Sequence, residues 1–291
     1  MANIAQRLSQ NVPGEFFVDS TCIDCDACRQ IEPSVYAELD EGYSFVHHQP
    51  KNDKETQRAL MALVTCPTGS IGTTTKLDIK AGVNALPELI EDNVYFCGFN
   101  SESSFGASSY VIQRPEGNVL VDSPRSARPL LKKLESMGGI KLMFLTHRDD
   151  VADHEDFHKH FGCDRILHRD DIGRSTQSIE IQPEGIEPVR IAGDLTVIPV
   201  PGHTRGHAVL LYRDKFLFTG DHLAWSTERN HLYAFRRHCW YSWEEQIKSM
   251  ERLLGYNFEW VLPGHGRRYR AESTAAMHGE MEQCVAWMKR Q

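Results

Sequence analysis

The sequence lacks any hydrophobic run long enough to cross a membrane. No apolar stretch approaches the ~20 residues that a transmembrane helix needs, so we expect a soluble protein with no membrane partner. Residues 1–17 lack the apolar core of a secretory signal peptide, which predicts a cytoplasmic location. An excess of positive charge is missing too, because 32 basic side chains stand against 40 acidic ones and give a net charge of −8. This balance disfavours non-specific binding of nucleic acid.

The composition is otherwise that of an ordinary globular chain, with 41% apolar and 25% charged residues. A length of 291 residues predicts two domains, at roughly 150 residues for each. Eight cysteines are the unusual feature. In a cytoplasmic protein, clustered cysteines more often bind metal or carry out redox chemistry than form disulfides.

Half of the cysteines form a pattern. Cys22, Cys25 and Cys28 are separated by two residues each, and Cys66 stands far downstream, directly before Pro67. Three thiolates at this spacing cover one face of a compact inorganic cluster, and a remote fourth thiolate completes it. A zinc site usually pairs two CxxC units and a redox dithiol needs only two cysteines, so the pattern favours an iron–sulfur cluster. The other four are expected to be ordinary buried thiols: Cys97, Cys163, Cys239 and Cys284.

Residues 14–80 resemble the single-cluster bacterial-type ferredoxins. The family pattern matches the four cysteines, and Ile23, Pro33 and Pro67 also stand where the family places similar residues. The resemblance implies one [4Fe–4S] cluster and a role in electron transfer. The second cysteine run of two-cluster ferredoxins is absent from the sequence. We place this domain at residues 1–80 and expect a linker at residues 73–87.

From residue 94 onward the chain reads as strands alternating with helices. Four pieces rich in histidine and aspartate each stand at the end of a predicted strand: residues 146–154, 201–207, 219–222 and 263–267. Side chains at strand ends can converge on one metal site at the edge of a sheet. Each piece alone has an ordinary interpretation as a turn or as the end of a strand. Four such pieces in this order are improbable by chance.

In this order the pieces resemble the metallo-β-lactamase superfamily, especially its glyoxalase II-like, persulfide dioxygenase-like and flavodiiron branches. The resemblance covers residues 92–268 and implies an αββα sandwich with a metal site at one edge. The two resemblances together predict an α+β protein, in which the ferredoxin-like domain precedes a metallo-β-lactamase sandwich at residues 81–291. Carried over residue by residue, the resemblance implies His147 and His203 as ligands of a first metal, Asp153, His154 and His265 as ligands of a second, and Asp221 as the bridge between them.

The first motif departs from the family pattern. Residues 148–153 separate His147 from His154, which is two residues more than the family has, and none of them is histidine. If Asp149 replaces the missing ligand, the first metal has two histidines and two carboxylates, as in the flavodiiron pattern, and iron or manganese is favoured over zinc. Asp150 could serve instead. If neither aspartate is a ligand, His147, His203 and Asp221 form a two-histidine, one-carboxylate set suited to a single iron(II).

Two further features concern the substrate. Arg205, two residues after His203, is a candidate for substrate contact. Residues 225–243 are rich in aromatic and cationic side chains, which predict an anion-binding wall, a docking face for the ferredoxin domain, or core packing. A small-molecule substrate, anionic in the first interpretation, and a redox partner protein are the expected partners.

These features support three hypotheses about function. The first is a metal-dependent hydrolase of an ester or thioester, in which the metal lowers the pKa of bound water and Asp153 orients the resulting hydroxide. The second is an iron-dependent oxidoreductase that receives electrons from its own ferredoxin domain. The third is a non-catalytic sensor of iron or redox state. The expected cofactors are a [4Fe–4S] cluster and one or two divalent metals, zinc, iron or manganese.

Overall fold

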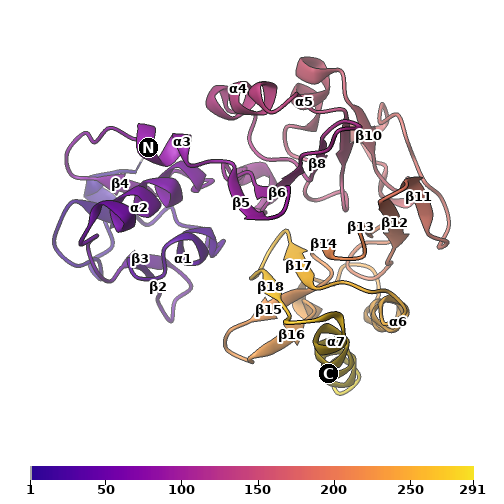
Figure 1. Ribbon diagram of the computed structural model, residues 1–291. Helices are drawn as coiled ribbons and strands as arrows, with labels where there is room; N and C mark the ends of the chain where they lie inside the picture. The colour runs from indigo at the N-terminus through magenta and orange to yellow at the C-terminus, as the bar shows by residue number, and fades with distance from the viewer. Residues whose placement is uncertain (1) are drawn as a thin grey trace.

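The computed structural model describes residues 2–291, and its N-terminal part is the small domain that carries the four patterned cysteines (Figure 1). Two pairs of antiparallel strands and two helices enclose them. These elements are β1 (Phe16–Val18) with β4 (Ile71–Thr73), β2 (Tyr36–Glu38) with β3 (Ser44–Val46), α1 (Ala27–Ile31) and α2 (Asp53–Thr65). Asn52 caps α2 by accepting a hydrogen bond from the Glu55 amide at 2.9 Å, and the helix ends where Pro67 stops its continuation.

The segment expected to be a linker contains a short helix, α3 (Lys80–Asn84), which begins at the domain boundary expected from the sequence. This helix packs directly on α2 through Gly82. A Cβ atom at Gly82 would lie only 2.5 Å from the Leu60 carbonyl carbon, so the two helices approach at backbone distance. The chain between the domains is therefore attached to the N-terminal domain.

The first of two six-stranded sheets follows, with the strand order β10-β9-β8-β7-β6-β5. The pairs β8–β9 and β9–β10 are parallel, and the other neighbouring strands of this sheet are antiparallel. Strand β8 reads Val-Leu-Val and is buried throughout, as expected for a strand covered on both faces. The bounds are β5 (Glu88–Glu91), β6 (Val94–Phe96), β7 (Tyr110–Ile112), β8 (Val119–Val121), β9 (Leu142–Phe144) and β10 (Asp164–Ile166).

The second sheet has the order β11-β12-β13-β14-β17-β18, antiparallel except where β14 runs beside β17. A separate hairpin, β15 (Ala224–Ser226) with β16 (His231–Tyr233), precedes the last two strands. The bounds are β11 (Val189–Ala192), β12 (Leu195–Pro199), β13 (Ala208–Tyr212), β14 (Phe216–Gly220), β17 (Trp260–Pro263) and β18 (Tyr269–Arg270).

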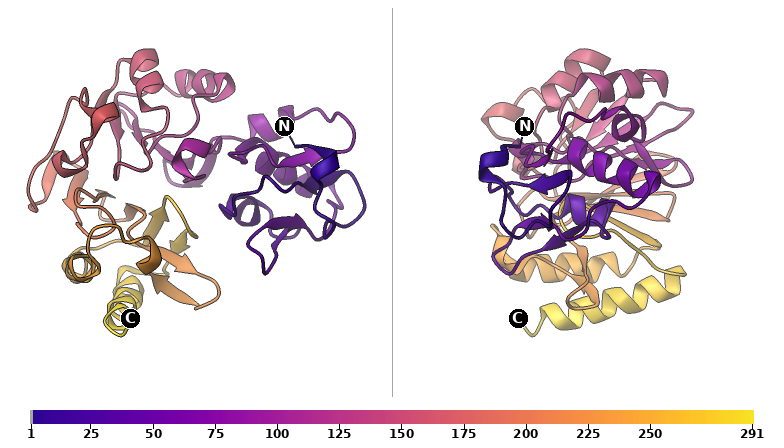
Figure 2. Two further views of the ribbon diagram at one scale, coloured as in Figure 1. Left: turned by 180° about the vertical axis from the view of Figure 1, so that it is seen from behind. Right: turned by 90° about the vertical axis from the view of Figure 1, so that its left-hand side faces the viewer.

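Helices cover the outer face of each sheet, so the layers run helix, sheet, sheet, helix (Figure 2). The four helices are α4 (Arg128–Ser136) and α5 (His154–Phe161) on the first sheet, and α6 (Trp243–Leu253) and α7 (Thr274–Met288) on the second. Short 3-10 turns connect other elements: η1 (Ile4–Gln6), η2 (Glu102–Ser104), η3 (Arg169–Asp171), η4 (Arg174–Thr176) and η5 (Arg236–His238). The arrangement is the αββα sandwich expected from the sequence.

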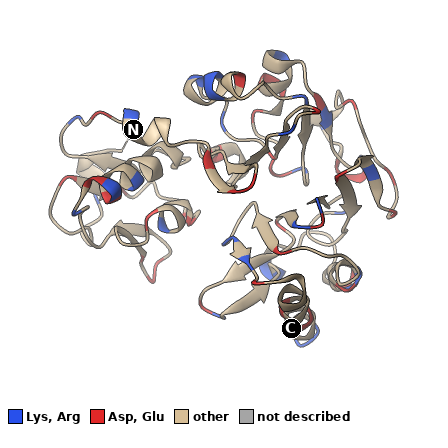
Figure 3. Ribbon diagram, viewed as in Figure 1, with Lys and Arg blue, Asp and Glu red and all other residues tan. Residues whose placement is uncertain are grey.

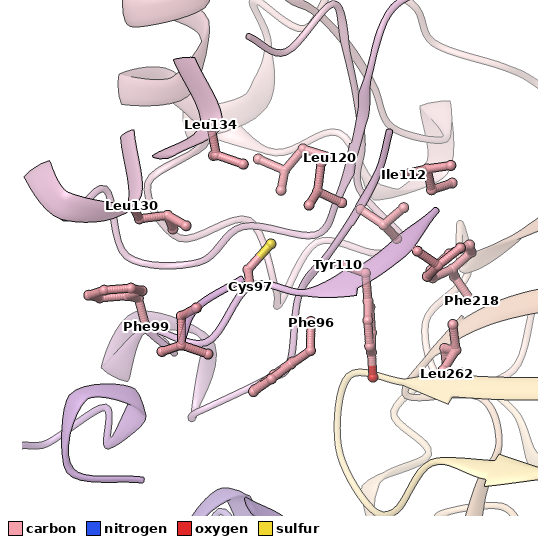
Figure 4. Packing of buried hydrophobic residues seen from close by; sticks show 14 of the residues in the cluster. Phe96, Cys97, Phe99, Tyr110, Ile112, Leu120, Leu130, Leu134, Phe218 and Leu262 are labelled. Atoms are coloured by element: carbon pink, nitrogen blue, oxygen red, sulfur yellow. The ribbon is translucent and has the colours of Figure 1, made fainter. Parts of the chain in front are cut away.

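The two faces of the second sheet bury different residues. Leu210 of β13 and Phe218 of β14 join the core between the sheets, whereas Val209 and Leu217 pack with residues of α6 and α7. This alternation is the period of two that a strand requires when both of its faces are covered. Tyr110 and Phe218 meet between the sheets with ring centroids 5.5 Å apart (Figure 4).

Among residues 2–291, no helix combines the length and the apolar composition needed to cross a membrane.

Candidate functional site

The four patterned cysteines line one small cavity in the N-terminal domain. Cys22 and Cys25 lie in the loop after β1, Cys28 lies on α1, and Cys66 ends α2. All four are free thiols. Asp24 and Asp26 have left-handed backbone conformations, with φ of 57° and 61°, and they bend the loop on either side of Cys25.

The cysteine site fits an iron–sulfur cluster better than a nucleophile. Burial raises the pKa of Cys25 to about 12 and raises that of Cys28 further, so neither thiol is activated in the absence of a metal. The Ser44 amide points at the Cys22 sulfur at 3.5 Å, and the Thr68 hydroxyl lies 3.7 Å from the Cys66 sulfur. Such contacts to sulfur are typical of cluster ligands.

A second set of ligand-type side chains gathers where strands of both sheets end. We call it the His/Asp group: His147, Asp149, Asp150, His203 and Asp221. The Nε2 atom of His147 lies 3.8–4.0 Å from carboxylate oxygens of Asp149, Asp150 and Asp221. The Nε2 atom of His203 lies 3.5 Å from Asp149 and 3.8 Å from Asp221. These separations are too long for hydrogen bonds but below twice the ~2.1 Å length of a metal–ligand bond.

The polar atoms of this group fit a metal ion. The Nε2 atom of His147, both ring nitrogens of His203 and both carboxylate oxygens of Asp150 are buried without a hydrogen-bond partner within residues 2–291. Buried polar atoms almost always have a partner, so their convergence points to a bound cation. Burial lowers the pKa of His147 to about 4, which leaves its imidazole neutral, as a metal ligand must be. Thr146 contacts the other ring nitrogen of His147 at 3.0 Å and orients the ring.

Asp221 lies between the two histidines and His265. One of its oxygens faces His147 and His203, and the other lies 2.7 Å from Nδ1 of His265. Burial alone would lower the pKa of His265, but the Asp221 carboxylate raises it to about 10. The second ring nitrogen of His265 donates to the Phe105 carbonyl at 3.3 Å. This carboxylate thus reaches both sides of the site, as a bridging ligand would.

Asp153 and His154, which the sequence places among the ligands, lie outside the His/Asp group. Asp153 accepts a hydrogen bond from the Ser126 amide at 2.8 Å, and Nδ1 of His154 lies 3.0 Å from the guanidinium of Arg165. The physical reason is the longer first motif, because its extra residues turn Asp150 inward before α5 begins. Asp150 was weighed from the sequence only as an alternative to Asp149, and the structure brings both to the site.

Sequence reasoning missed a residue that holds the second motif. Asp171 on η3 is buried and accepts hydrogen bonds from the Thr204 hydroxyl at 2.5 Å and the Gly206 amide at 2.8 Å. It lies in an unremarkable run of charged residues, and no local pattern marks it. Arg205, the residue expected to contact substrate, points outward and pairs with Asp170 at 3.3 Å.

Two histidines support the site without joining it. The buried ring of His207 stacks on that of His147 at a centroid distance of 4.8 Å, and its Nε2 accepts a hydrogen bond from the Asp221 amide at 3.2 Å. Burial lowers the pKa of His222 to about 3, and its ring lies against His207. Both imidazoles are therefore neutral packing partners of the ligand histidines.

A wide groove separates the two domains, and charged residues of both signs occur on both (Figure 3). Its walls include Cys25 on the ferredoxin side and His265 on the sandwich side, so one groove touches both candidate centres. Residues of the aromatic and cationic segment line it as well: Trp225, Arg229, Tyr233, Phe235, Arg236, Arg237 and His238. The segment therefore lines a groove between the domains.

Comparison with known proteins agrees with this architecture. Residues 18–73 match the family model described as the 4Fe-4S single cluster domain of ferredoxin I. Among solved structures, the chain is similar to TMB-1 (TM-score 0.52, 16% identity, 67% of this chain and 96% of that one). It is similar to the DIM-1 metallo-β-lactamase (TM-score 0.51, 17% identity, 67% of this chain and 95% of that one). It is also similar to a metallo-β-lactamase from Pontibacter korlensis (TM-score 0.50, 18% identity, 67% of this chain and 97% of that one). No curated protein matches the sequence.

The fold and the two sites define a metallo-β-lactamase-fold protein whose His/Asp group could hold a metal. The chain joins this fold to an N-terminal 4Fe–4S ferredoxin domain. At these identities the similarity to solved structures shows the fold alone.

Proposed function

We propose that the protein is an iron-dependent oxidoreductase in which the ferredoxin domain delivers electrons to the His/Asp group of the same chain. The observation that carries this proposal is the position of Phe105 and Gly106 between the two sites. Gly106 packs against Cys25, and the Phe105 carbonyl accepts a hydrogen bond from His265.

The contact at Gly106 requires glycine. A Cβ atom there would lie 2.5 Å from Cβ and 3.1 Å from the sulfur of Cys25, and φ is +84°. Only a residue without a side chain lets the backbone come this close to a cluster ligand. Gly106 is joined by one peptide unit to the Phe105 carbonyl. This carbonyl accepts a hydrogen bond from His265, which in turn contacts Asp221. Because electron transfer weakens steeply with distance, this short connection favours transfer within the chain.

The ligand types favour iron at the His/Asp group. His147 and His203 would supply nitrogen, and Asp149 and Asp221 oxygen, a mixed set suited to iron or manganese. When bound, the cluster would supply single electrons. Iron at the His/Asp group would supply a redox-active position for the substrate. Burial keeps the His147 imidazole neutral by lowering its pKa, and Asp171 holds the loop that carries His203 in place.

The substrate of this proposal is a small anion that enters the groove between the domains. Arg237 lines the groove and, within residues 2–291, no carboxylate lies within 4 Å of its guanidinium. The neighbouring Arg236 lies over the Trp243 ring at 5.7 Å rather than in an ion pair. Guanidinium groups left without carboxylate partners suit an anionic ligand.

The hydrolytic hypothesis has less support from the geometry. Its orienting base, Asp153, is engaged with the Ser126 amide and lies outside the His/Asp group. A hydrolase also has no use for the approach of Gly106 to Cys25.

Anaerobic purification followed by metal analysis and EPR tests the proposal. We expect four irons matched by four acid-labile sulfides, together with additional iron whose signal changes after the cluster is reduced. Zinc in place of the additional iron, with no response to reduction, would overturn it and support hydrolysis. Additional iron that responds to reduction but turns over no anionic acceptor would support the sensor.

A matched pair of variants tests the connection itself. Gly106→Ala and Gly162→Ala both place a side chain at a left-handed glycine, with φ of +84° and +66°. Only Gly106 faces a cysteine, whereas nothing lies within 4 Å of a Cβ at Gly162. Rapid-mixing measurements should show slower electron transfer from the reduced cluster in Gly106→Ala alone. Equal rates in both variants would refute the role of this contact.

A further inference from the structure

The loop after β17 approaches the cysteine segment at three successive residues. Gly266 and Arg267 contact it directly, and His265 reaches it through Phe105 and Gly106. Each contact joins parts of the chain that are far apart in sequence. We define the cysteine segment as residues 22–30, which contain three of the four cysteines and most of α1, and the histidine loop as residues 264–267. Figure 1 shows α1 on the side of the ferredoxin domain that faces the sandwich.

The strongest of the three contacts is an ion pair. The guanidinium of Arg267 approaches both carboxylate oxygens of Asp26, with Nε to Oδ2 at 3.1 Å and Nη2 to Oδ1 at 3.2 Å. Two parallel contacts of this kind fix orientation as well as distance. Asp26 stands between Cys25 and Cys28 in the sequence, so the pair ties the histidine loop to the centre of the cysteine segment.

The other two contacts act on the neighbours of Arg267. Gln30, on α1, donates a hydrogen bond from Nε2 to the Gly266 carbonyl at 3.0 Å. His265 donates to the Phe105 carbonyl, and the adjacent Gly106 rests on Cys25. Gly266 is itself confined, because a Cβ atom there would lie 2.6 Å from Cβ of Ala224. The histidine loop thus rests on the hairpin below it and on the cysteine segment beside it.

The cysteine segment has a conformation that needs support. Asp24 and Asp26 are non-glycine residues with positive φ, a state that costs free energy and persists only where the surroundings impose it. The thiols on either side of these residues are the groups that a cluster would hold in place. Without a cluster, relaxation of Asp26 would release Arg267, and movement of α1 would release Gly266.

We propose that the cysteine segment, held by its assembled cluster, positions His265 and, through their 2.7 Å contact, the Asp221 carboxylate, so that metal affinity at the His/Asp group depends on the cluster. Asp26, Gln30 and Arg267 are the positioning residues. The inference rests on the metal site of the proposed function but not on electron transfer. It predicts an order of assembly in which the cluster is inserted before the metal.

Cobalt(II) titration, read by its visible absorbance in competition with a chelator, measures this dependence. The starting material is full-length protein with an intact cluster and no metal at the His/Asp group. Removing an outer partner of a metal ligand typically weakens metal binding by about 10–100-fold. We expect a loss of this size in Arg267→Gln and a smaller loss in Arg267→Lys, which keeps the charge but not the paired contacts.

Arg270→Gln is the matched control. Arg270 lies three positions along the chain and pairs with Glu91 at 3.2 Å, within the sandwich and away from the cysteine segment. We expect Arg270→Gln to bind cobalt as the unmodified protein does, and the visible absorbance of the cluster to be the same in all variants. Equal affinity in Arg267→Gln and the unmodified protein would overturn the inference, as would an equal loss in Arg270→Gln.

Two further measurements keep the test decisive. Gln30→Ala removes one contact without changing the charge and replaces Arg267→Gln if that variant does not fold. Hydrogen exchange of the amides at residues 264–270 should be faster in protein stripped of its cluster than in intact protein. Unchanged exchange, together with unchanged cobalt affinity after stripping, would refute the dependence. Because cobalt binding needs no electron transfer, loss of the proposed redox activity would leave this result intact.

Discussion

The close packing of α3 on α2 can be tested by one methyl group. Gly82 lies inside α3, where alanine would normally stabilise the helix by about 0.8–1 kcal/mol relative to glycine. Here a Cβ atom would lie 2.5 Å from the Leu60 carbonyl carbon, 2.6 Å from its oxygen and 2.8 Å from the Met61 nitrogen. All three are backbone atoms of α2 that cannot rotate away, so steric overlap opposes helix propensity.

We expect the steric overlap with α2 to outweigh the gain in helix propensity. Extra volume in a packed interior costs about 1–3 kcal/mol, and the upper part of this range applies where no side chain can move aside. Subtracting the gain in helix propensity leaves Gly82→Ala less stable by about 1–2 kcal/mol. Gly279→Ala is the matched control, because Gly279 lies in α7 with nothing within 4 Å of a Cβ. This variant should be more stable by about 0.5–1 kcal/mol.

Native-state hydrogen exchange gives the local stability of each helix separately, which suits a two-domain protein that need not unfold in one step. We expect the amides of α2 to exchange about 5–30-fold faster in Gly82→Ala. The amides of α7 should exchange more slowly in Gly279→Ala. If Gly82→Ala slowed exchange in α2, helix propensity would have prevailed, and the described contact between α2 and α3 would be wrong.

Three further substitutions test the core, a surface network and the metal site. Tyr110→Phe removes a 2.7 Å hydrogen bond to the buried Pro263 carbonyl, and urea unfolding should show a loss of about 1–3 kcal/mol. Burial would raise the pKa of Glu180, but hydrogen bonds from Arg165 lower it to about 2. The unmodified protein should therefore have a higher free energy of unfolding than Glu180→Gln. This difference should be fully present at pH 7, decrease below pH 4.5 and vanish near pH 2, as measured by denaturation across that range. Asp221→Asn should lose metal at the His/Asp group while cluster absorbance is retained, as metal analysis will show.

Local patterns predicted much of the fold. The apolar runs at residues 208–212 and 216–219, with a turn at Arg213 and Asp214 between them, are typical of paired strands, and the structure has them as β13 and β14. The sequence pattern at residues 153–161 is that of a helix stopped by Gly162, and the structure has α5 at His154–Phe161 with Gly162 at its end. Helix α3 could not be predicted, because five residues with a central glycine carry no helical period. Its stability comes from contact with α2, which sequence periodicity does not report.

The site was predicted less completely, for a related reason. Histidine and aspartate at strand ends are visible in sequence, and His147, His203 and Asp221 do converge. The path of the longer first motif is not visible in the sequence, so the inward position of Asp150 and the positions of Asp153 and His154 outside the His/Asp group needed the structure. Contacts between distant segments are equally hidden. Gln30 and Gly266 are 236 positions apart, and neither belongs to a recognisable motif.

The shared core of the two domains limits how they can work together. Buried residues from β1 and α2 belong to the same continuous apolar cluster as those of the first sheet, and Arg125 donates to the Val64 carbonyl at 3.2 Å across the boundary. Relative motion of domains is expected only where their interface is small or polar. Gly82, Gly98 and Gly106 each bring backbone close to a neighbouring element at this junction, which further resists sliding. The cysteine site and the His/Asp group are therefore held at a fixed separation, and any coupling between them must pass through the contacts at residues 105–106 and 265–267 rather than through a swinging domain.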